Sequence, residues 1–307
     1  FQAGRAEAGY KLLKSSVLDG MYLGDSPGNF GQISFYDAAR GECYRDFGDP
    51  IGVASRVLIQ GLFGILPDAL NQQIILRPGF PDDWDKASVS TPDISYRFTR
   101  KEDTDTYHIT QRFQTPLHPV LQINARKEKI RSVKVNGVSA KWHWRKDAIN
   151  QPQIIVDAGE YSNYTIEIIW AGKEFKLLEG KQKVIQYDTC RFAFPQQKIT
   201  SIQDLQHALS NIIHTTETIS FIAKSLGKHQ FFIGLKQGET EWIQTIEIDV
   251  QPQIDIVQTH KESQELSIAL VNNSSKKIQG NIFANNQLLQ TSTLKANDTL
   301  LLNIPAT

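Results

Sequence analysis

The sequence predicts a mainly β, multidomain protein whose first part is helical. Three observations lead to this fold class. At 307 residues the chain is too long for one ordinary core, so two to four domains are expected. Apolar residues follow a helical period up to about residue 66. From about residue 73 onward, segments alternate between apolar and polar residues or are rich in β-branched residues, with turn signals between them.

Two helices are expected before the strands. Residues 3–23 carry a broad apolar stripe at helical spacing. The second helix is expected over residues 51–66. Asp49 and Pro50 are a strong start signal, because Asp caps free N–H groups and Pro fits the first helical position. Pro67 is expected to end it.

The second helix is apolar on nearly every face, which predicts burial on most sides. Its glycines, Gly52, Gly61 and Gly64, each cost about 1 kcal/mol of helix propensity relative to Ala. Close helix packing would offset that cost. Because two antiparallel helices cannot shelter this much apolar surface, we expect them to belong to a larger helical assembly.

The strand-rich part of the sequence after residue 70 is expected to form several domains, with boundaries where the pattern of apolar and polar residues changes. Asn136-Gly137 between two alternating runs predicts a two-residue hairpin in an antiparallel β-sandwich. Residues 201–212 fit either a strand or a short helix. The last stretch is polar and Asn-rich, with about five strands. The predicted domains are a helical segment with a loop (1–70), the β-sandwich (71–175), an immunoglobulin-like β domain (176–250) and a small C-terminal β domain that could be truncated (251–307).

Residues 25–49, between the two predicted helices, are rich in glycine and chemically dense. The stretch contains five carboxylates, two arginines and five aromatic residues: Asp25, Asp37, Glu42, Asp46 and Asp49; Arg40 and Arg45; Phe30, Phe35, Tyr36, Tyr44 and Phe47. Helix–helix connections usually span about 2–8 residues, and longer ones tend to be functional or disordered. Disordered segments are poor in aromatic residues. We therefore expect an ordered loop with the composition that a sugar-binding cleft needs.

Composition excludes several classes of function. The formal net charge is zero, so nothing prepares the chain for nucleic acid or an anionic membrane. The longest apolar run, residues 57–66, is too short to span a bilayer. No Cys or His spacing fits a metal site, and no cofactor is expected. The two cysteines, Cys43 and Cys190, are expected to be buried free thiols, with a disulfide left open.

Residues 47–90, FGDPIGVASRVLIQGLFGILPDALNQQIILRPGFPDDWDKASVS, resemble the junction in six-hairpin (α/α)6-barrel glycoside hydrolases and phosphorylases. In that family a final apolar helix ends in a segment of the form GL.GI.PD, and a segment of the form ILRP.FP..W..ASV opens a β-sandwich. The similarity is strongest to the α-L-rhamnosidase-like group and its Bacteroidetes relatives. Residues 28–50 and 227–242 resemble that group as well.

The resemblance implies that residues 1–70 are the last helical hairpin and cleft loop of the barrel, which holds the active site. Glycoside hydrolysis uses two carboxyl groups that flank the scissile bond. The family places an acid in the loop before the last barrel helix, and the catalytic candidates here are Asp37 and Glu42. The tryptophan-flanked acid motif usual in the family is absent. The residues assigned to substrate binding are Asn29, Tyr36, Arg40, Arg45 and Asp46.

The chain opens as if inside a helical domain, without methionine, signal peptide or capping sequence. We therefore expect it to be the C-terminal portion of a longer protein, processed or truncated. The missing barrel region would be its partner and would supply the second carboxylate. Alone, the chain is expected to hydrolyse nothing. The resemblance implies a periplasmic or extracellular location.

Several candidate residues also have a purely structural interpretation. Asp49 is expected to be a helix cap, and Arg40 and Arg45 could pair with neighbouring carboxylates. Trp142 and Trp144 alternate along one strand, so both rings project from one face, as sandwich core or as a carbohydrate platform. A larger set is expected to have no catalytic role because its members fall in strand patterns: His108, His118, His143 and His229.

Three functions compete at this point. The first is the C-terminal portion of a glycoside hydrolase that acts on a plant or host polysaccharide or oligosaccharide. The second is a non-catalytic carbohydrate-binding or structural β-sandwich accessory module. An inverting disaccharide phosphorylase ranks lower, because it needs Arg, His or Ser residues clustered near the acid for phosphate, and no such cluster stands out.

Overall fold

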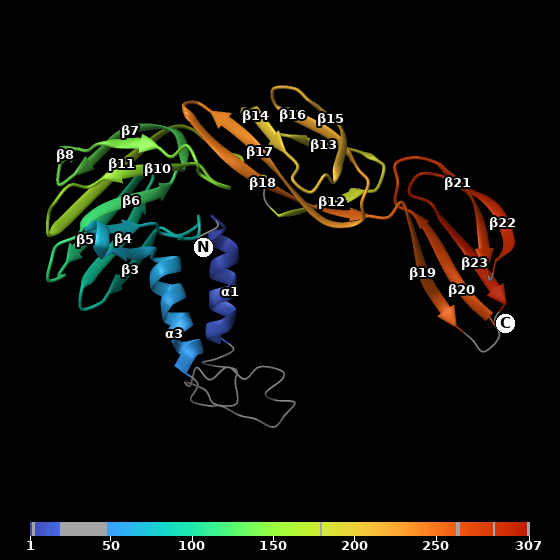
Figure 1. Ribbon diagram of the computed structural model, residues 1–307, viewed down its shortest axis with the longest axis horizontal. Coiled ribbons are helices and arrows are strands. Elements are labelled where there is room, and N and C mark those ends of the chain that lie inside the picture. The colour runs from blue at the N-terminus through green and yellow to red at the C-terminus, as the bar shows by residue number, and fades with distance from the viewer. Residues whose placement is uncertain (2–3, 19–47, 179, 262–264, 285, 306–307) are drawn as a thin grey trace. The chain divides into compact units, whose positions relative to one another are not determined.

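The protein, described here as a computed structural model, is mainly β and contains several sheets (Figure 1). The structure describes residues 1–307 except 2–3, 19–47, 179, 262–264, 285 and 306–307. The chain forms two compact units. Unit 1 comprises Phe1–Phe175 with Gln237–Ile243, and unit 2 comprises Lys176–Lys236 with Gln244–Thr307. The four domain ranges expected from the sequence stay predictions.

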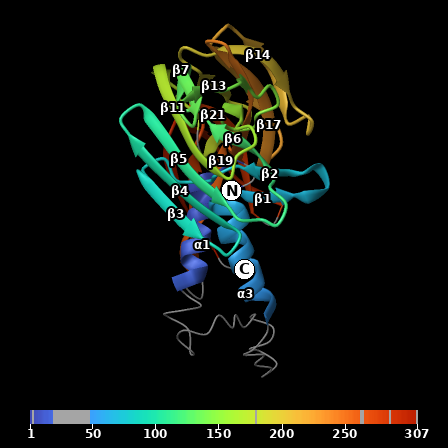
Figure 2. The same cartoon turned by 90° about the vertical axis from the view of Figure 1, so that its left-hand side faces the viewer.

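Unit 1 opens with the helical segment. Helix α1 spans Ala6–Leu18, and helix α3 spans Gly48–Arg56 and continues as a π-helix, η2, over Val57–Leu62. Figures 1 and 2 show α1 and α3 side by side and running in opposite directions. Helix α3 begins one residue before Asp49, whose side chain lies outside the description.

The second helix ends earlier than the sequence predicts. It stops at Leu62 instead of residue 66, and Ile65–Asp68 forms strand β1. Gly64 is the cause, because it adopts a left-handed φ of 66° that a helix cannot continue. Its carbonyl accepts a hydrogen bond from the Arg77 backbone N–H at 2.9 Å, and a Cβ at Gly64 would overlap the Arg77 carbonyl. This close backbone approach starts the pairing of β1 with the next strand.

Two sheets build the remainder of unit 1. Sheet A contains, in spatial order, β1, β2 (Gln73–Leu76), β6 (His118–Asn124), β10 (Gln153–Asp157) and β9 (Trp142–Trp144), with the short 3-10 helix η3 (Ala69–Asn71) between β1 and β2. Sheet B contains β3 (Lys86–Ser90), β4 (Ile94–Lys101), β5 (Thr104–Gln111), β11 (Asn163–Glu174), β7 (Lys127–Val135) and β8 (Val138–Ser139).

The two sheets share one hydrophobic core, so they form the sandwich that the sequence predicts. Leu121 and Ile154 of sheet A belong to the same buried cluster as Phe98, Ile166 and Trp170 of sheet B. The pairing is antiparallel except between β2 and β6. The chain leaves sheet A after β2, builds β3 to β5 in sheet B and returns beside β2 in the same direction. Parallel neighbours require such a crossover.

The hairpin predicted at Asn136-Gly137 is confirmed. It joins β7 to β8, with Val135 paired to Val138. Asn136 and Gly137 have φ values of 51° and 82°. Positive φ at both central residues is the geometry of a type I′ turn, whose twist matches that of the strands.

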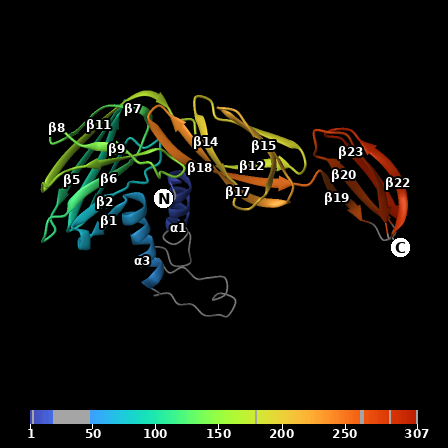
Figure 3. The same ribbon diagram turned by 45° about the horizontal axis from the view of Figure 1, so that its top comes forward.

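Unit 2 contains a four-stranded and a three-stranded sheet, followed by five further strands in its described part (Figure 3). The first two sheets consist of β12 (Lys181–Ile185), β18 (Thr240–Gln251), β17 (Gly227–Gln237) and β14 (Lys198–Gln203), and of β13 (Thr189–Ala193), β16 (Thr218–Ala223) and β15 (Leu209–His214). Residues 201–212 contribute to β14 and β15, so the strand alternative is correct there.

The last five strands also form two sheets. They are β19 (Ile254–Lys261), β20 (Glu265–Asn272) and β23 (Thr299–Pro305) in one, and β21 (Ile278–Ala284) and β22 (Gln287–Leu294) in the other. The strand number agrees with the sequence prediction. Asp188, before β13, is buried and accepts hydrogen bonds from the hydroxyls of Ser274 and Ser275 after β20, at 2.6 and 2.9 Å.

Candidate functional site

Of the predicted loop, Gly48 and Asp49 belong to α3, and residues 25–47 lie outside the described residues. This holds for both catalytic candidates, Asp37 and Glu42, and for every residue assigned to substrate binding: Asn29, Tyr36, Arg40, Arg45 and Asp46. Cys43 also falls there. Cys190 is a free thiol, half-buried, and burial raises the pKa of its thiol. The catalytic hypothesis therefore stays a prediction.

Of the two interpretations of Trp142 and Trp144, the structure supports sandwich core over a carbohydrate platform. Trp142 and Trp144 are partly buried and pack against the sandwich core, with ring centroids 5.8 Å apart in an edge-to-face arrangement. The Trp144 Nε1 atom is buried and has no hydrogen-bond partner among the described residues. Rings that pack inward offer no platform for a sugar.

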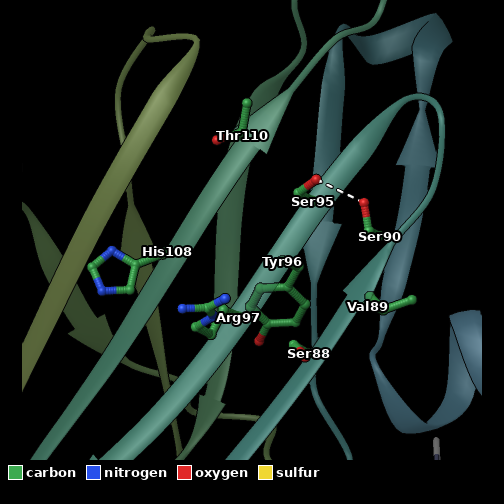
Figure 4. Close-up of a pocket in the computed structure, with 8 residues that line it drawn as sticks. All are labelled: Ser88, Val89, Ser90, Ser95, Tyr96, Arg97, His108 and Thr110. Atoms are coloured by element: carbon green, nitrogen blue, oxygen red, sulfur yellow. Dashed lines mark hydrogen bonds between the residues drawn. The ribbon is translucent and has the colours of Figure 1, made fainter.

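Among the described residues, an open hollow lies outside these predictions. It lies on the outer face of sheet B, over β3, β4 and β5 (Figure 4), with a volume of about 390 Å³. Its lining consists of Ser88, Val89, Ser90, Ser95, Tyr96, Arg97, His108 and Thr110.

Strand alternation explains why this face is polar. Inward positions such as Tyr96 belong to the core, so their neighbours in each strand point outward. The strand register then aligns the outward side chains in rows. One row runs Ser88, Arg97, His108 across β3, β4 and β5. Short serine side chains beside the longer Arg97 and His108 leave the surface hollow between them.

Hydrogen bonds fix several of these side chains. The hydroxyls of Ser90 and Ser95 lie 3.0 Å apart. His108 Nδ1 lies 3.2 Å from the hydroxyl of Thr165 on β11. The Thr110 hydroxyl donates to Asn163 Oδ1 at 2.9 Å. These contacts preorganise hydroxyl and imidazole groups along the strands.

The positive charge of the hollow is not neutralised locally. Arg97 is exposed, and within the described ranges its guanidinium makes no hydrogen bond or ion pair. Arg112 borders the same face, where its Nη2 donates to the Ser95 hydroxyl at 2.9 Å. Of the residues that line the hollow, none is a carboxylate. The lining therefore lacks the pair of carboxyl groups that glycoside hydrolysis uses.

A second feature is the joint between the helices and the sandwich. Phe63, just after η2, packs edge-to-face on Phe80 at 5.4 Å, and Tyr10 of α1 packs on Trp84 at 4.9 Å. Glu7 of α1 accepts a hydrogen bond from the Asp82 backbone N–H at 3.0 Å. These contacts join the helices of unit 1 to its sandwich.

Beneath the joint lies a buried charge. Asp105 is fully buried and accepts hydrogen bonds from Arg100 Nε at 3.0 Å, Arg126 Nη1 at 3.1 Å and Trp170 Nε1 at 2.9 Å. Burial, and after it the Asp105 charge, raises the pKa of the Tyr96 hydroxyl well above its usual value. With its carboxylate fully paired, Asp105 serves the structure.

Two general features complete the description. Where the structure describes the chain, no cluster of three or more His, Cys, Asp or Glu side chains could hold a metal ion. None of the described helices is long and apolar enough to cross a membrane.

No protein-family model and no curated protein matches the sequence. Among solved structures, the chain is similar to immunoglobulin domains 1–4 of Sidekick-1, at 10% identity and a TM-score of 0.19, over 73% of this chain and 57% of that one. It is also similar to the four N-terminal Ig domains of Dscam1 isoform 6.9, at 8% identity and a TM-score of 0.18, over 72% and 76% of the two chains. At these TM-scores the similarity carries no argument about this chain.

Proposed function

We infer that the chain is the C-terminal portion of a glycoside hydrolase, in which the β domains are accessory to an (α/α)6 barrel. The observation that carries this proposal is the joint between helices and sandwich. It is built from residues 61–84, the part of the sequence with the family resemblance, and it holds α1 and η2 against the sandwich core.

The helices leave apolar surface uncovered, which supports a larger helical assembly. Leu12 of α1 is 71% exposed and Val53 of α3 is 59% exposed, and Leu18 and Leu58 are exposed as well. A helix with apolar residues outside its buried stripe is normally covered by other elements. Further barrel helices would cover these side chains.

In this proposal the substrate is a carbohydrate and catalysis is by carboxyl groups. Asp37 or Glu42 would act as general acid or base, and the second carboxylate would come from the upstream barrel region. The protein would act in the periplasm or outside the cell. The 4 + 3 strand arrangement of residues 181–251 has the strand number of an immunoglobulin-like sandwich, which fits an accessory domain.

A second candidate is a carbohydrate-binding accessory module without catalysis. The hollow on sheet B favours it, because it offers an unpaired guanidinium, an imidazole and hydroxyls in one open site. The two candidates differ in whether the 25–49 loop is needed for turnover.

The test uses the longer protein with its barrel. Asp37→Asn and Glu42→Gln are compared with Glu160→Gln, an exposed position of the sandwich, in hydrolysis of a cognate glycan. We expect at least one loop variant to lose about 10²-fold or more in kcat, the typical contribution of a general acid or base, while the control keeps wild-type activity. Full activity in both loop variants would remove the loop from catalysis.

A further inference from the structure

We propose that the hollow over β3, β4 and β5 binds an anionic sugar, whose carboxylate or sulfate pairs with Arg97. The proposal deepens the carbohydrate function inferred above, since it names the ligand class, but it needs no catalytic residue. It rests on the charge, the hydroxyl pattern and the shape of this face.

The positive charge of the hollow indicates that its ligand carries an anionic group. Arg97 carries a guanidinium without a described partner, and Arg112 adds a second positive charge at the border. Every other side chain in the lining is neutral or, in the case of His108, an imidazole. A planar guanidinium presents paired N–H donors that match a carboxylate or sulfate in a bidentate geometry. The site is therefore suited to one negative group.

The hydroxyl groups that line the hollow indicate that the ligand is a sugar. Ser88 and Ser90 on β3 and Thr110 on β5 flank Arg97 and His108 (Figure 4). The Ser88 hydroxyl can both donate and accept, whereas the Thr110 hydroxyl donates to Asn163 and can only accept from a ligand. Vicinal sugar hydroxyls are matched by such an array of alternating donors and acceptors.

The absence of an aromatic platform argues against neutral sugars. Tyr96, the aromatic residue in the lining, has its ring in the core, where it stacks on Phe80 and Tyr107. Without a ring to stack on, affinity has to come from the salt bridge and the polar contacts. The hollow's volume of about 390 Å³ lies within the range of about 300–1,000 Å³ that is usual for ligand pockets.

Calorimetry with three matched tetrasaccharides tests the proposal on the 307-residue chain. The probes are a galacturonic acid oligomer with carboxylates, a sulfated galactose oligomer and a neutral galactose oligomer. We expect binding of at least one anionic probe, weakened by added salt, and binding of the neutral probe that is at least about tenfold weaker.

Substitutions locate the site. Arg97→Gln is expected to weaken the anionic probe about tenfold or more, and Arg97→Lys to restore part of the loss, because Lys keeps the charge without the fork. Arg131→Gln, which removes an equivalent exposed charge from β7 of the same sheet, is the matched control and is expected to bind like wild type. Thermal melts check that all three variants fold, as exposed positions should allow.

The outcomes separate the sources of the anion. Binding of the galacturonic acid oligomer alone identifies a uronic acid, and binding of the sulfated oligomer alone identifies a sulfated sugar. The proposal fails if no probe binds at millimolar concentration, if the neutral oligomer binds as tightly as the charged ones, or if Arg97→Gln has no effect. Binding is measured on the 307-residue chain and hydrolysis on the longer protein, so glycan binding and hydrolysis can fail independently.

Discussion

At the scale of single residues, Gly64 fixes the point where the helix stops and the sandwich starts. Its φ of 66° is left-handed, and its carbonyl holds the Arg77 N–H. We predict that Gly64→Ala destabilises the chain by about 1–3 kcal/mol from backbone strain alone, with more from the overlap with the Arg77 carbonyl. Chemical denaturation measures the loss.

Gly52→Ala is the matched control. Gly52 lies inside α3, and a Cβ there would meet nothing within 4 Å. We expect it to leave stability unchanged or raise it by up to about 1 kcal/mol through helix propensity. Equal losses in the two variants would show that Gly64 has no special backbone role.

Asp105 is the residue whose loss should cost most in the sandwich. Its carboxylate is buried between Arg100, Arg126 and the Trp170 indole. Asp105→Ala leaves two guanidinium groups without their common partner, so we predict a loss of about 3–5 kcal/mol. Asp103, two residues away, pairs with Lys127 at the surface, and Asp103→Ala should have a much smaller effect on the melting temperature. A mild Asp105→Ala would contradict this view of the core.

Asp188 makes unit 2 sensitive to acid. Burial by itself raises the pKa of this carboxyl, but hydrogen bonds from Ser274 and Ser275 outweigh burial and hold the pKa below its usual value. A depressed pKa in the folded state stabilises the protein above the pKa of the unfolded chain, and this stability is lost as the pH falls through the folded value.

Thermal unfolding between about pH 6 and pH 2.5 tests this linkage. We expect the melting temperature of the wild type to fall below about pH 4, in part because Asp188 takes up a proton there. We predict a shallower fall for Asp188→Asn. An unchanged pH profile in that variant would assign the acid sensitivity to other carboxyl groups.

At the scale of elements, local patterns predicted most strands but missed what depends on register or backbone conformation. Asn136-Gly137 specified its turn, because positive φ at both positions is a local property. Gly64 was predicted to lie inside the helix, because the spacing of apolar residues does not reveal that a glycine has a left-handed φ. The expected close helix packing is not what Gly61 and Gly52 show: a Cβ at Gly61 would lie 2.7 Å from the ring of Phe1, which precedes α1, and a Cβ at Gly52 would meet nothing within 4 Å.

The hollow escaped sequence analysis for a related reason. Alternation alone places Arg97 on the outer face of β4 and His108 on the outer face of β5. Only the pairing register sets them directly opposite each other, next to Ser88. The histidine was correctly placed in a strand, but its neighbours across the sheet were not predictable from spacing.

The exposed helix faces give an element-scale prediction. If further barrel helices cover α1, Leu12→Gln should cost about 1.5–3 kcal/mol in the longer protein, the value of burying a leucine, and almost nothing in the 307-residue chain. Leu70→Gln, at a position 98% exposed beside the sandwich, should be silent in both proteins. Equal effects of Leu12→Gln in the two proteins would mean that nothing covers this face.

At the scale of the whole molecule, we propose that the β domains and the catalytic residues belong to different parts of the protein. The described residues provide a sandwich, a joint between helices and sandwich, and a polar hollow whose described lining contains no carboxylate. We propose that catalysis belongs to the 25–49 loop together with an upstream barrel. This proposal rests on the resemblance of residues 47–90 to the hydrolase family. The residues of this chain alone do not predict the opposite side of the cleft, which would carry the second carboxylate.

Turnover of aryl glycosides by the isolated 307-residue chain and by the longer protein with its barrel tests this division most directly. We predict no hydrolysis by the isolated chain and measurable hydrolysis by the longer protein. Turnover by the isolated chain, or a longer protein that binds glycans but cleaves none, would contradict it.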